Sequence, residues 1–329
     1  MKNHYFFRFG TNNHLFHNFY KFSDNNNELV YKDEFNHLNE NGIVLAIYYD
    51  NFTVKDIENL VLTKQNTGNI ESGHKNNVIH FYKSPVGSYF WIFSDTHLLA
   101  FEQISDTPFC FPDDYDHYND KYNNPHKTLA KCKKFKDPII FNRFKVPEIF
   151  STTDSSRIYG TLVLLNEQPP KFENCMIAQA MVSGTPINVP DVKAALRYLS
   201  PIQLETLFFK YFNDNGYIVT SHRGGSKYKV DIEIKDYSLK DSVFIPSFQI
   251  QIQVKRLFTD YKEIESYLDK GIYFATLSEI DLSKLKQNRQ FFIGPDQIQK
   301  LLLQDNIGAK KTIHWIKEVL GYDYFDFKF

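Results

Sequence analysis

Hydrophobic residues in the first half of the chain occur in short runs that are rich in aromatic side chains. Residues 5–7 and 89–93 are such runs, and turns containing Asn and Gly separate them. Aromatic and β-branched residues are typical of strands, and residues 42–49 are apolar enough to predict a buried strand. Residues 53–62 instead repeat apolar positions at helical spacing and predict a short helix. We therefore predict an α+β domain of β-barrel type over residues 1–165.

The second half opens on a clear helix signal. Ser200 is a suitable N-cap, a proline follows at the first helical position, and Gln203 completes a capping box. Apolar residues then recur on one face as far as Gly216, a residue type that ends helices in the left-handed conformation. The pattern predicts a helix between Ser200 and Gly216, with Glu205 on the flank of its apolar face.

Two strands with strict alternation of apolar and polar residues follow this helix, at residues 228–235 and 248–255. The polar face of the second strand carries Gln251, Gln253 and Lys255. This is unusual, because a central strand gains most by burying apolar side chains on both faces. An edge strand with one wetted face is the alternative explanation, and the neighbouring residues are needed to choose between the two.

Proline and glycine residues punctuate the chain between its halves, at Pro169, Pro170, Gly184, Pro186 and Pro190. They predict a linker over residues 166–190 and a second domain over residues 191–329. Within that domain the pattern predicts two further helices, at 261–268 and 312–320.

Composition narrows the class of protein. A length of 329 residues suits about two domains, and 38 basic against 39 acidic residues give a net charge of −1. Any nucleic-acid binding must therefore come from local patches. Three cysteines are too few for a disulfide framework. The apolar runs are far shorter than the ~20 residues that cross a bilayer, and the N-terminus lacks a secretory pattern, so we expect a cytoplasmic protein that does not enter membranes.

A helix with Glu205, a strand with Asp231 and a paired strand with Gln253-x-Lys255 follow one another along the chain. This order resembles the PD-(D/E)XK nuclease superfamily. The closest similarity is to its Mrr-like restriction endonuclease branch, in which Gln replaces the usual acidic residue of the last motif. The resemblance covers residues 199–303, and it implies a further core strand at 271–276 and a strand-to-helix step at 291–298. It implies an α/β fold for the second domain, a restriction-endonuclease-like domain with a central mixed sheet.

The resemblance also implies a Mg²⁺ site, with Mn²⁺ as a substitute. Hydrolysis of a phosphodiester needs a cation to neutralise the developing charge, and Mg²⁺ prefers oxygen ligands. Asp231 would supply an anionic ligand, Gln253 a neutral carbonyl oxygen, and Val254 its backbone carbonyl. Glu205 would add a second carboxylate through a metal-bound water. Lys255, on the same face as Gln253, would orient the attacking water or stabilise charge on the phosphate.

Other residues are weaker candidates for substrate contact. Arg223, Lys227 and Lys229 lie in or beside a Gly-rich turn, where they either approach a phosphate backbone or are ordinary surface charges. Gln251 shares the polar strand face, although a solvent-facing strand residue is the favoured interpretation.

The aromatic first half has a faint similarity to PUA-like or EVE-like barrels, which hold a flipped, modified base between aromatic rings. Trp91 and Tyr89, together with Tyr48 and Tyr49, are the candidate walls of such a pocket. The favoured alternative is that these rings are core and surface aromatics of a β domain.

These observations predict a Mg²⁺-dependent DNA endonuclease that restricts foreign or modified DNA, in antiviral defence. By analogy we expect a homodimer, because paired sites cut both strands, and we keep open a partner protein from a defence system. Two alternatives stay open as well. The same fold could act in nucleic-acid processing or repair, or the chain could be a non-catalytic nucleic-acid-binding subunit of a defence or repair assembly.

Overall fold

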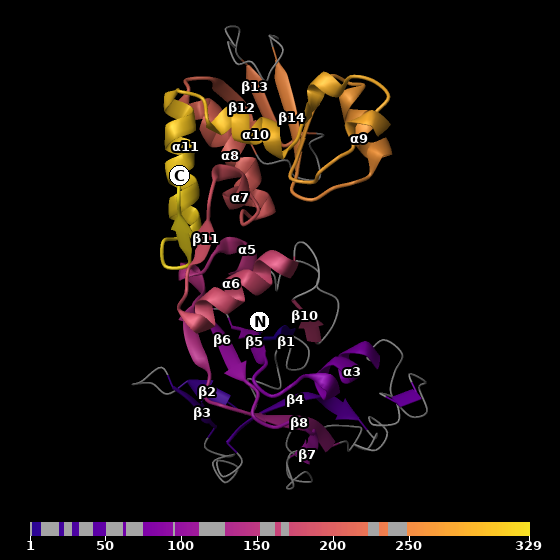
Figure 1. Ribbon diagram of the computed structural model, residues 1–329, viewed down its shortest axis with the longest axis vertical. Coiled ribbons are helices and arrows are strands. Elements are labelled where there is room, and N and C mark those ends of the chain that lie inside the picture. Colours follow the sequence, from indigo (N-terminus) through magenta and orange to yellow (C-terminus); the bar gives the residue numbers. More distant parts are fainter. Residues whose placement is uncertain are drawn as a thin grey trace. The chain divides into compact units, whose positions relative to one another are not determined.

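The computed structural model divides the chain into two compact units, shown in Figure 1. Unit 1 comprises residues 1–146 and 151–183, and unit 2 comprises residues 147–150 and 184–329. The structure describes residues 2–7, 20–22, 28–32, 42–50, 62–63, 75–94, 96–111, 129–151, 162–165, 171–222, 230–235 and 249–329. Of the predicted helix at 53–62, only the last residue belongs to this described set.

Unit 1 is built on a five-stranded mixed sheet in the order β10-β1-β5-β6-β9. Its strands are β1 (His4–Phe7), β5 (Tyr89–Phe93), β6 (His97–Glu102), β9 (Ile139–Asn142) and β10 (Leu162–Leu164). Strands β1 and β5 pair in parallel, whereas the other neighbours are antiparallel. The aromatic runs predicted as strands at 5–7 and 89–93 are confirmed.

A three-stranded antiparallel sheet in the order β4-β8-β7 and a two-stranded pair, β2-β3, complete the strands of unit 1. They are β2 (Tyr20–Phe22), β3 (Leu29–Tyr31), β4 (Ile43–Asp50), β7 (Phe109–Phe111) and β8 (Leu129–Phe135). Strand β4 confirms the buried strand predicted at 42–49. The barrel is wrong for the described strands, because β9 and β10 lie at opposite ends of the five-stranded sheet and do not pair with each other.

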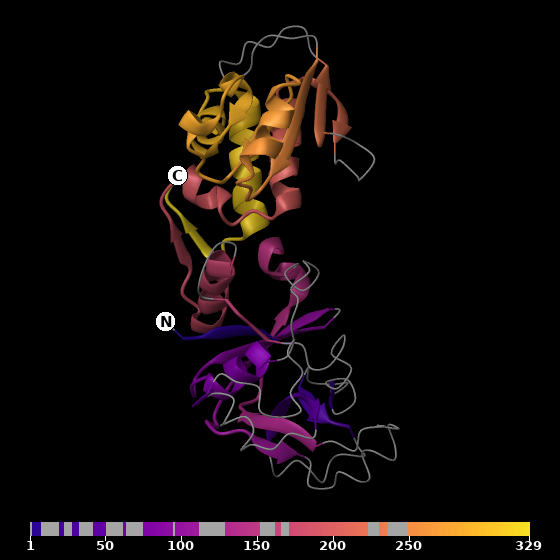
Figure 2. The same cartoon turned by 90° about the vertical axis from the view of Figure 1, so that its right-hand side faces the viewer.

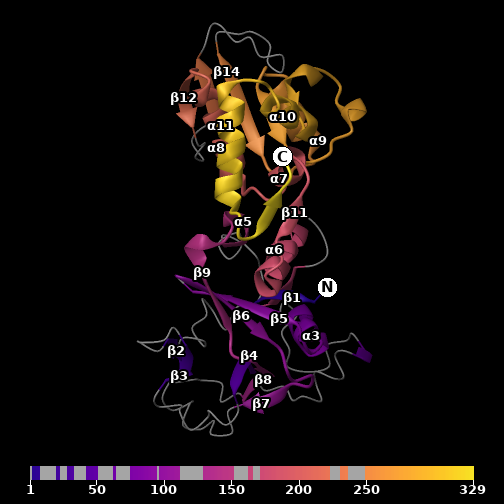
Figure 3. The ribbon, with the colours of Figure 1, turned by 60° about the vertical axis from the view of Figure 1, so that its left-hand side comes forward.

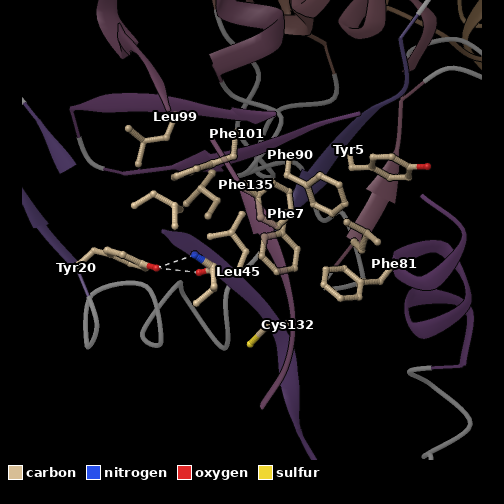
Figure 4. Close-up of a cluster of buried hydrophobic side chains, with 14 of the residues drawn as sticks. Tyr5, Phe7, Tyr20, Leu45, Phe81, Phe90, Leu99, Phe101, Cys132 and Phe135 are labelled. Carbon is tan, nitrogen blue, oxygen red and sulfur yellow. Dashed lines mark hydrogen bonds between the residues drawn. The ribbon is translucent and has the colours of Figure 1, made fainter. Parts of the chain in front are cut away.

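Phe90 of β5 lies at the centre of the unit 1 core, and Figure 4 shows the rings that surround it. Its ring meets those of Phe7, Phe81 and Phe135 edge-to-face, with centroids 5.7, 6.0 and 5.0 Å away. Phe81 comes from helix α3 (Lys75–Lys83) and Phe135 from β8. Edge-to-face contacts of this kind add to the gain from burying apolar area. One aromatic residue therefore joins both sheets and the helix.

Lys133 of β8 is fully buried beside this core. Its Nζ donates to the carbonyl oxygens of Tyr82 and Ser84 and to the Ser84 hydroxyl, each at 3.1 Å. These carbonyls lie at the C-terminal end of α3, where a cation is favourable because it meets the negative end of the helix dipole. Burial lowers the pKa of Lys133 to about 8. Lys133 thus ties β8 to the end of α3.

His4 of β1 is also fully buried, and its ring has two partners. The indole N–H of Trp91 donates to Nδ1 of His4 at 3.2 Å, and Nε2 lies 3.2 Å from Oε1 of Gln179. Since Nδ1 accepts, Nε2 carries the hydrogen and donates to Gln179. Burial lowers the pKa of His4 to about 4, so the ring is neutral at pH 7.

The predicted linker at 166–190 contains a helix, α6 (Lys171–Ser183), which supplies Gln179 and belongs to unit 1. The two prolines of the predicted linker, Pro169 and Pro170, lie outside the described residues. Gly184 follows with a φ of 66°, the left-handed conformation that ends helices. Within the described part of the predicted linker, unit 2 begins at Gly184, and a short segment without helix or strand leads from there to β11 (Ile187–Val189).

Unit 2 is built on a second five-stranded mixed sheet, in the order β12-β13-β14-β15-β16. The strands are β12 (Ile218–His222), β13 (Ile232–Lys235), β14 (Ile250–Lys255), β15 (Tyr273–Thr276) and β16 (Phe292–Ile293). Strand β13 pairs antiparallel with both β12 and β14, whereas β15 pairs parallel with both β14 and β16. A separate parallel pair joins β11 to β17 (Phe325–Phe327), and Figure 2 shows these two strands side by side.

The described helices of unit 2 are α5 (Glu148–Ser151), α7 (Val192–Leu196), α8 (Pro201–Asp214), α9 (Tyr261–Leu268), α10 (Pro295–Leu302) and α11 (Ile307–Leu320). Helices α8 to α11 correspond to predicted elements, whereas α5 and α7 were not predicted. Short 3₁₀ helices lie at Arg143–Lys145 in unit 1 and at Leu282–Lys284 and Arg289–Phe291 in unit 2. Figure 3 shows α11 along α8, with which it packs. None of the described helices is long and apolar enough to cross a membrane.

The start of α8 confirms the predicted capping box. The Ser200 hydroxyl accepts from the backbone N–H of Gln203 at 3.1 Å, and the Gln203 side chain accepts from the backbone N–H of Ser200 at 3.0 Å. Gly216 follows the helix with a φ of 85°. Helix α8 packs against β12, β13 and β14. The local capping signal therefore marks the start of a helix that contacts the first three strands of the sheet.

We predict that unit 1 loses stability as the pH falls from about 6.5 to about 4. His4 stays neutral in the folded chain, whereas in the unfolded chain it gains a proton near pH 6.5, so protons favour unfolding in this window by up to about 3 kcal/mol. Urea unfolding followed by Trp91 fluorescence, in a Trp315→Phe background, measures this. His4→Gln should flatten the curve between pH 4 and 6.5, and an equally steep curve would contradict the assignment.

Candidate functional site

Asp231 lies directly before β13 and opposite Gln253 of β14. The β13–β14 register pairs Ile232 with Ile252, and the Asp231 N–H donates to the Ile252 carbonyl at 3.1 Å. The Asp231 side chain is only 7% exposed. Its Oδ2 accepts from Nε2 of Gln253 and from the backbone N–H of Val254, the latter at 2.7 Å. The structure therefore brings together three of the residues that the sequence analysis selected.

Two oxygen atoms of this pair receive no hydrogen bond from the described part of the chain. Both hydrogen bonds to Asp231 end on Oδ2, and among the described residues none donates to Oδ1 of Asp231 or to Oε1 of Gln253. A carboxylate oxygen and an amide oxygen on adjacent strands are ligands that a hard divalent cation prefers. In the described ranges no three His, Cys, Asp or Glu side chains gather as a metal site. The ligand set expected from the sequence contains only two such side chains, Asp231 and Glu205, so it would not form a group of three.

Lys255 lies two residues beyond Gln253 and hence on the same face of β14. Its side chain is half-buried, and its positive charge acts on Asp231. Burial raises the pKa of Asp231 above its usual value, and the Val254 N–H, Lys255 and Gln253 oppose part of that rise. A cation bound beside Asp231 would favour its ionised form in the same way as Lys255 does.

Glu205 lies in the second turn of α8 and is half-buried. It makes no hydrogen bond to Asp231 or Gln253 in the described part of the chain. Helix α8 does pack against β13 and β14, so Glu205 belongs to an element that contacts both strands of the pair. A role through an intervening water, as the resemblance implies, needs no direct bond.

Gln251 pairs with Glu233 of β13, a residue that the sequence analysis did not select. Its Nε2 donates to Oε2 of Glu233 at 3.3 Å, and the Thr220 hydroxyl donates to Oε1 at 3.0 Å. Gln251 is half-buried and Thr220 is exposed. Glu233 lies on the same face as Asp231, and that strand alternation was the signal that could have identified it.

Arg256 is a second residue that the sequence analysis missed. It is 8% exposed, and its Nε donates to the Leu199 carbonyl at 2.7 Å while Nη2 donates to the Arg197 carbonyl. Leu199 directly precedes Ser200, the cap of α8. Arg256 therefore connects the end of β14, next to Lys255, to the start of the helix that carries Glu205. One arginine after a strand gives no sequence signal for such a contact.

Tyr267 of α9 is the third such residue. Its ring packs on Phe274 of β15, with centroids 5.7 Å apart, and Phe274 lies beside Gln253 in the β14–β15 register. Burial raises the pKa of the Tyr267 phenol, and the negative charges of Glu263 and Asp231 raise it further. Helix α9 therefore covers the sheet face that carries Gln253. It also places the Tyr267 phenol close enough to Asp231 for the negative charge of that carboxylate to act on it.

The remaining candidates are either outside the described residues or part of unit 1. Arg223, Lys227 and Lys229 lie outside the described residues, as do the side chains of Tyr48 and Tyr49. Trp91 and Tyr89 belong to unit 1, where Trp91 is 0% exposed and stacks on Phe141, and Tyr89 stacks on His4. This placement favours the alternative in which Trp91 and Tyr89 are core aromatics.

A scan against protein-family models found none that matches this chain, and searches of curated proteins and of solved structures also found no match. The candidate site therefore stands on its own geometry.

We predict that Arg256→Ala lowers the unfolding free energy of unit 2 by about 2–4 kcal/mol, because the buried Leu199 carbonyl and the part-buried Arg197 carbonyl lose a charged donor. Arg289→Ala is the matched control. Arg289 also donates to two carbonyls, those of Leu285 and Ser283, but it is exposed, so we expect a loss below about 1 kcal/mol. Urea unfolding followed by Trp315 fluorescence measures both, and equal losses would contradict the role of Arg256.

We also predict that Asp231→Asn does not destabilise unit 2 at pH 7. Because burial raises the Asp231 pKa, its charged form is disfavoured in the folded chain, and any stability it contributes is lost as the pH rises through that pKa. Asn removes the charge and keeps an oxygen for the Val254 N–H. Asp231→Ala, which leaves that N–H without its acceptor, should cost about 1–3 kcal/mol. An Asn variant as unstable as the Ala variant would overturn the prediction.

Proposed function

We propose that unit 2 is a metal-dependent nuclease that hydrolyses phosphodiester bonds in DNA. The observation that carries this proposal is the convergence of Asp231, Gln253 and Lys255 on one sheet face, with oxygens of the first two left available. A cation ligand, a neutral oxygen and a lysine are the groups that phosphodiester hydrolysis requires.

The order of elements supports the same proposal. Helix α8, the antiparallel strands β12 to β14, helix α9 and the parallel strand β15 follow one another as the resemblance to PD-(D/E)XK nucleases leads one to expect. The strand-to-helix step from β16 to α10 comes last. A restriction-endonuclease-like fold for unit 2 is part of the proposal.

Asp231 and Gln253 would hold Mg²⁺ or Mn²⁺, with the Val254 carbonyl and a water bound to Glu205 as further ligands. The bound cation would neutralise charge on the phosphate and lower the pKa of a bound water. Gln253 also positions Asp231, because its amide donates to Oδ2 and leaves Oδ1 for the ligand. Val254 assists through its N–H, which holds the same oxygen at 2.7 Å.

Lys255 has two roles in this proposal. Its ammonium group places positive charge near Asp231 and lowers the proton affinity of that carboxylate. It would also face the phosphate, where it orients the attacking water and stabilises charge in the transition state. We extend the proposal to restriction of foreign or modified DNA by a homodimer, in which two sites cut the two strands.

We predict that the full-length chain cleaves plasmid or phage DNA with Mg²⁺ or Mn²⁺ and that chelator stops it. Lys255→Ala should lower the rate about a thousandfold, because the variant loses a charged group at the reacting phosphate. Lys235→Ala is the matched control, since Lys235 is an exposed lysine at the end of β13 and should leave the rate unchanged.

Modified and unmodified substrates should be compared in the same assay. Cleavage by the wild type that persists in Lys255→Ala would contradict the assigned role of Lys255. DNA binding without cleavage under every condition would favour the alternative, a non-catalytic nucleic-acid-binding subunit.

A further inference from the structure

We propose that Tyr267 is a substrate-binding residue, whose phenol donates a hydrogen bond to a non-bridging oxygen of the phosphate held at Asp231. This inference rests on the proposed nuclease function and deepens it. It assigns a substrate contact to a residue of α9, whereas the expected site residues belong to α8, β14 and the start of β13.

The position of Tyr267 follows from packing. Ile264 and Leu268 of α9 are fully buried in one cluster with Phe274, and Tyr267 packs at the margin of that cluster. Phe274 lies beside Gln253 in the strand register, and the partner of Gln253 is Asp231. The ring of Tyr267 is therefore held by Phe274 next to the strand pair that carries the candidate cation ligands.

The hydroxyl group of Tyr267 has no structural task in the described part of the chain. No described residue makes a hydrogen bond with it, whereas the buried phenols of Tyr20 and Tyr211 and the phenol of Tyr261 all have partners. The hydroxyl of a half-buried tyrosine usually finds a partner at its polar end. A ligand bound at Asp231 would supply that partner.

The charges around Tyr267 explain why a phenol suits this position. Glu263, one turn earlier on α9, and Asp231 both act on it, and burial together with these charges raises its pKa. The group therefore stays protonated and remains a donor throughout the neutral range. A neutral donor can approach a phosphate without cancelling the negative charge that holds the cation.

The test compares wild type, Tyr267→Phe and Tyr261→Phe as full-length proteins. Tyr267→Phe keeps the ring on Phe274 and removes only the hydroxyl. Tyr261→Phe removes a hydroxyl from the same helix, one that accepts from the Asp281 N–H at 3.2 Å, and serves as the control. Binding of a labelled DNA duplex is measured by fluorescence anisotropy with Ca²⁺ in place of Mg²⁺, and cleavage is measured with Mg²⁺.

We expect Tyr267→Phe to lower kcat/KM or duplex affinity about ten- to a hundredfold, the effect of losing one hydrogen bond to a charged group. Tyr261→Phe should match the wild type in both assays. If Tyr267→Phe also matches a wild type that cleaves and binds, this inference is wrong and the nuclease proposal stands. If the wild type neither binds nor cleaves the duplex, the nuclease proposal fails and the inference fails with it.

Discussion

The antiparallel register between β13 and β14 is the constraint on which the candidate site depends. It pairs Ile232 with Ile252, and so places Asp231 opposite Gln253 on the other face. Side chains alternate along a strand, so a slip of one residue would turn every side chain of that strand to the opposite face of the sheet. The polar residues would then point into the core and the isoleucines away from it. Burial of the isoleucines therefore holds the polar residues together. The energy that specifies the site comes from residues that take no part in it.

Placing charged groups in this position has a cost in stability. Burial raises the pKa of Asp231 and so disfavours its ionised form, an effect that Lys255 opposes in part and that a bound cation would oppose further. Arg256 offsets part of such a cost through its bonds to the carbonyls of Arg197 and Leu199, which join the end of β14 to the start of α8. Groups arranged for binding or catalysis commonly destabilise a fold that other contacts support.

In unit 1, too, buried polar side chains are supported by contacts with other parts of the fold. Its aromatic core surrounds Phe90, and outside that cluster unit 1 also buries a histidine and a lysine fully. Each polar group is matched, His4 by Trp91 and Gln179 and Lys133 by the carbonyls at the end of α3. Buried polar groups with complete hydrogen bonds specify a unique arrangement, whereas incomplete ones are costly. We infer that these pairs fix how α6 and α3 dock onto the sheets of unit 1.

The sequence by itself determined the features that depend on neighbouring residues. The capping box at Ser200, the left-handed end at Gly216 and the alternation along β14 are local, so they predicted α8 and the polar strand face. Tertiary structure decided what depends on distant segments: the open sheets instead of a barrel, helix α6 within the predicted linker, and the positions of Arg256 and Tyr267. Their contacts join segments far apart in sequence, and only packing of the whole core determines which side chains meet.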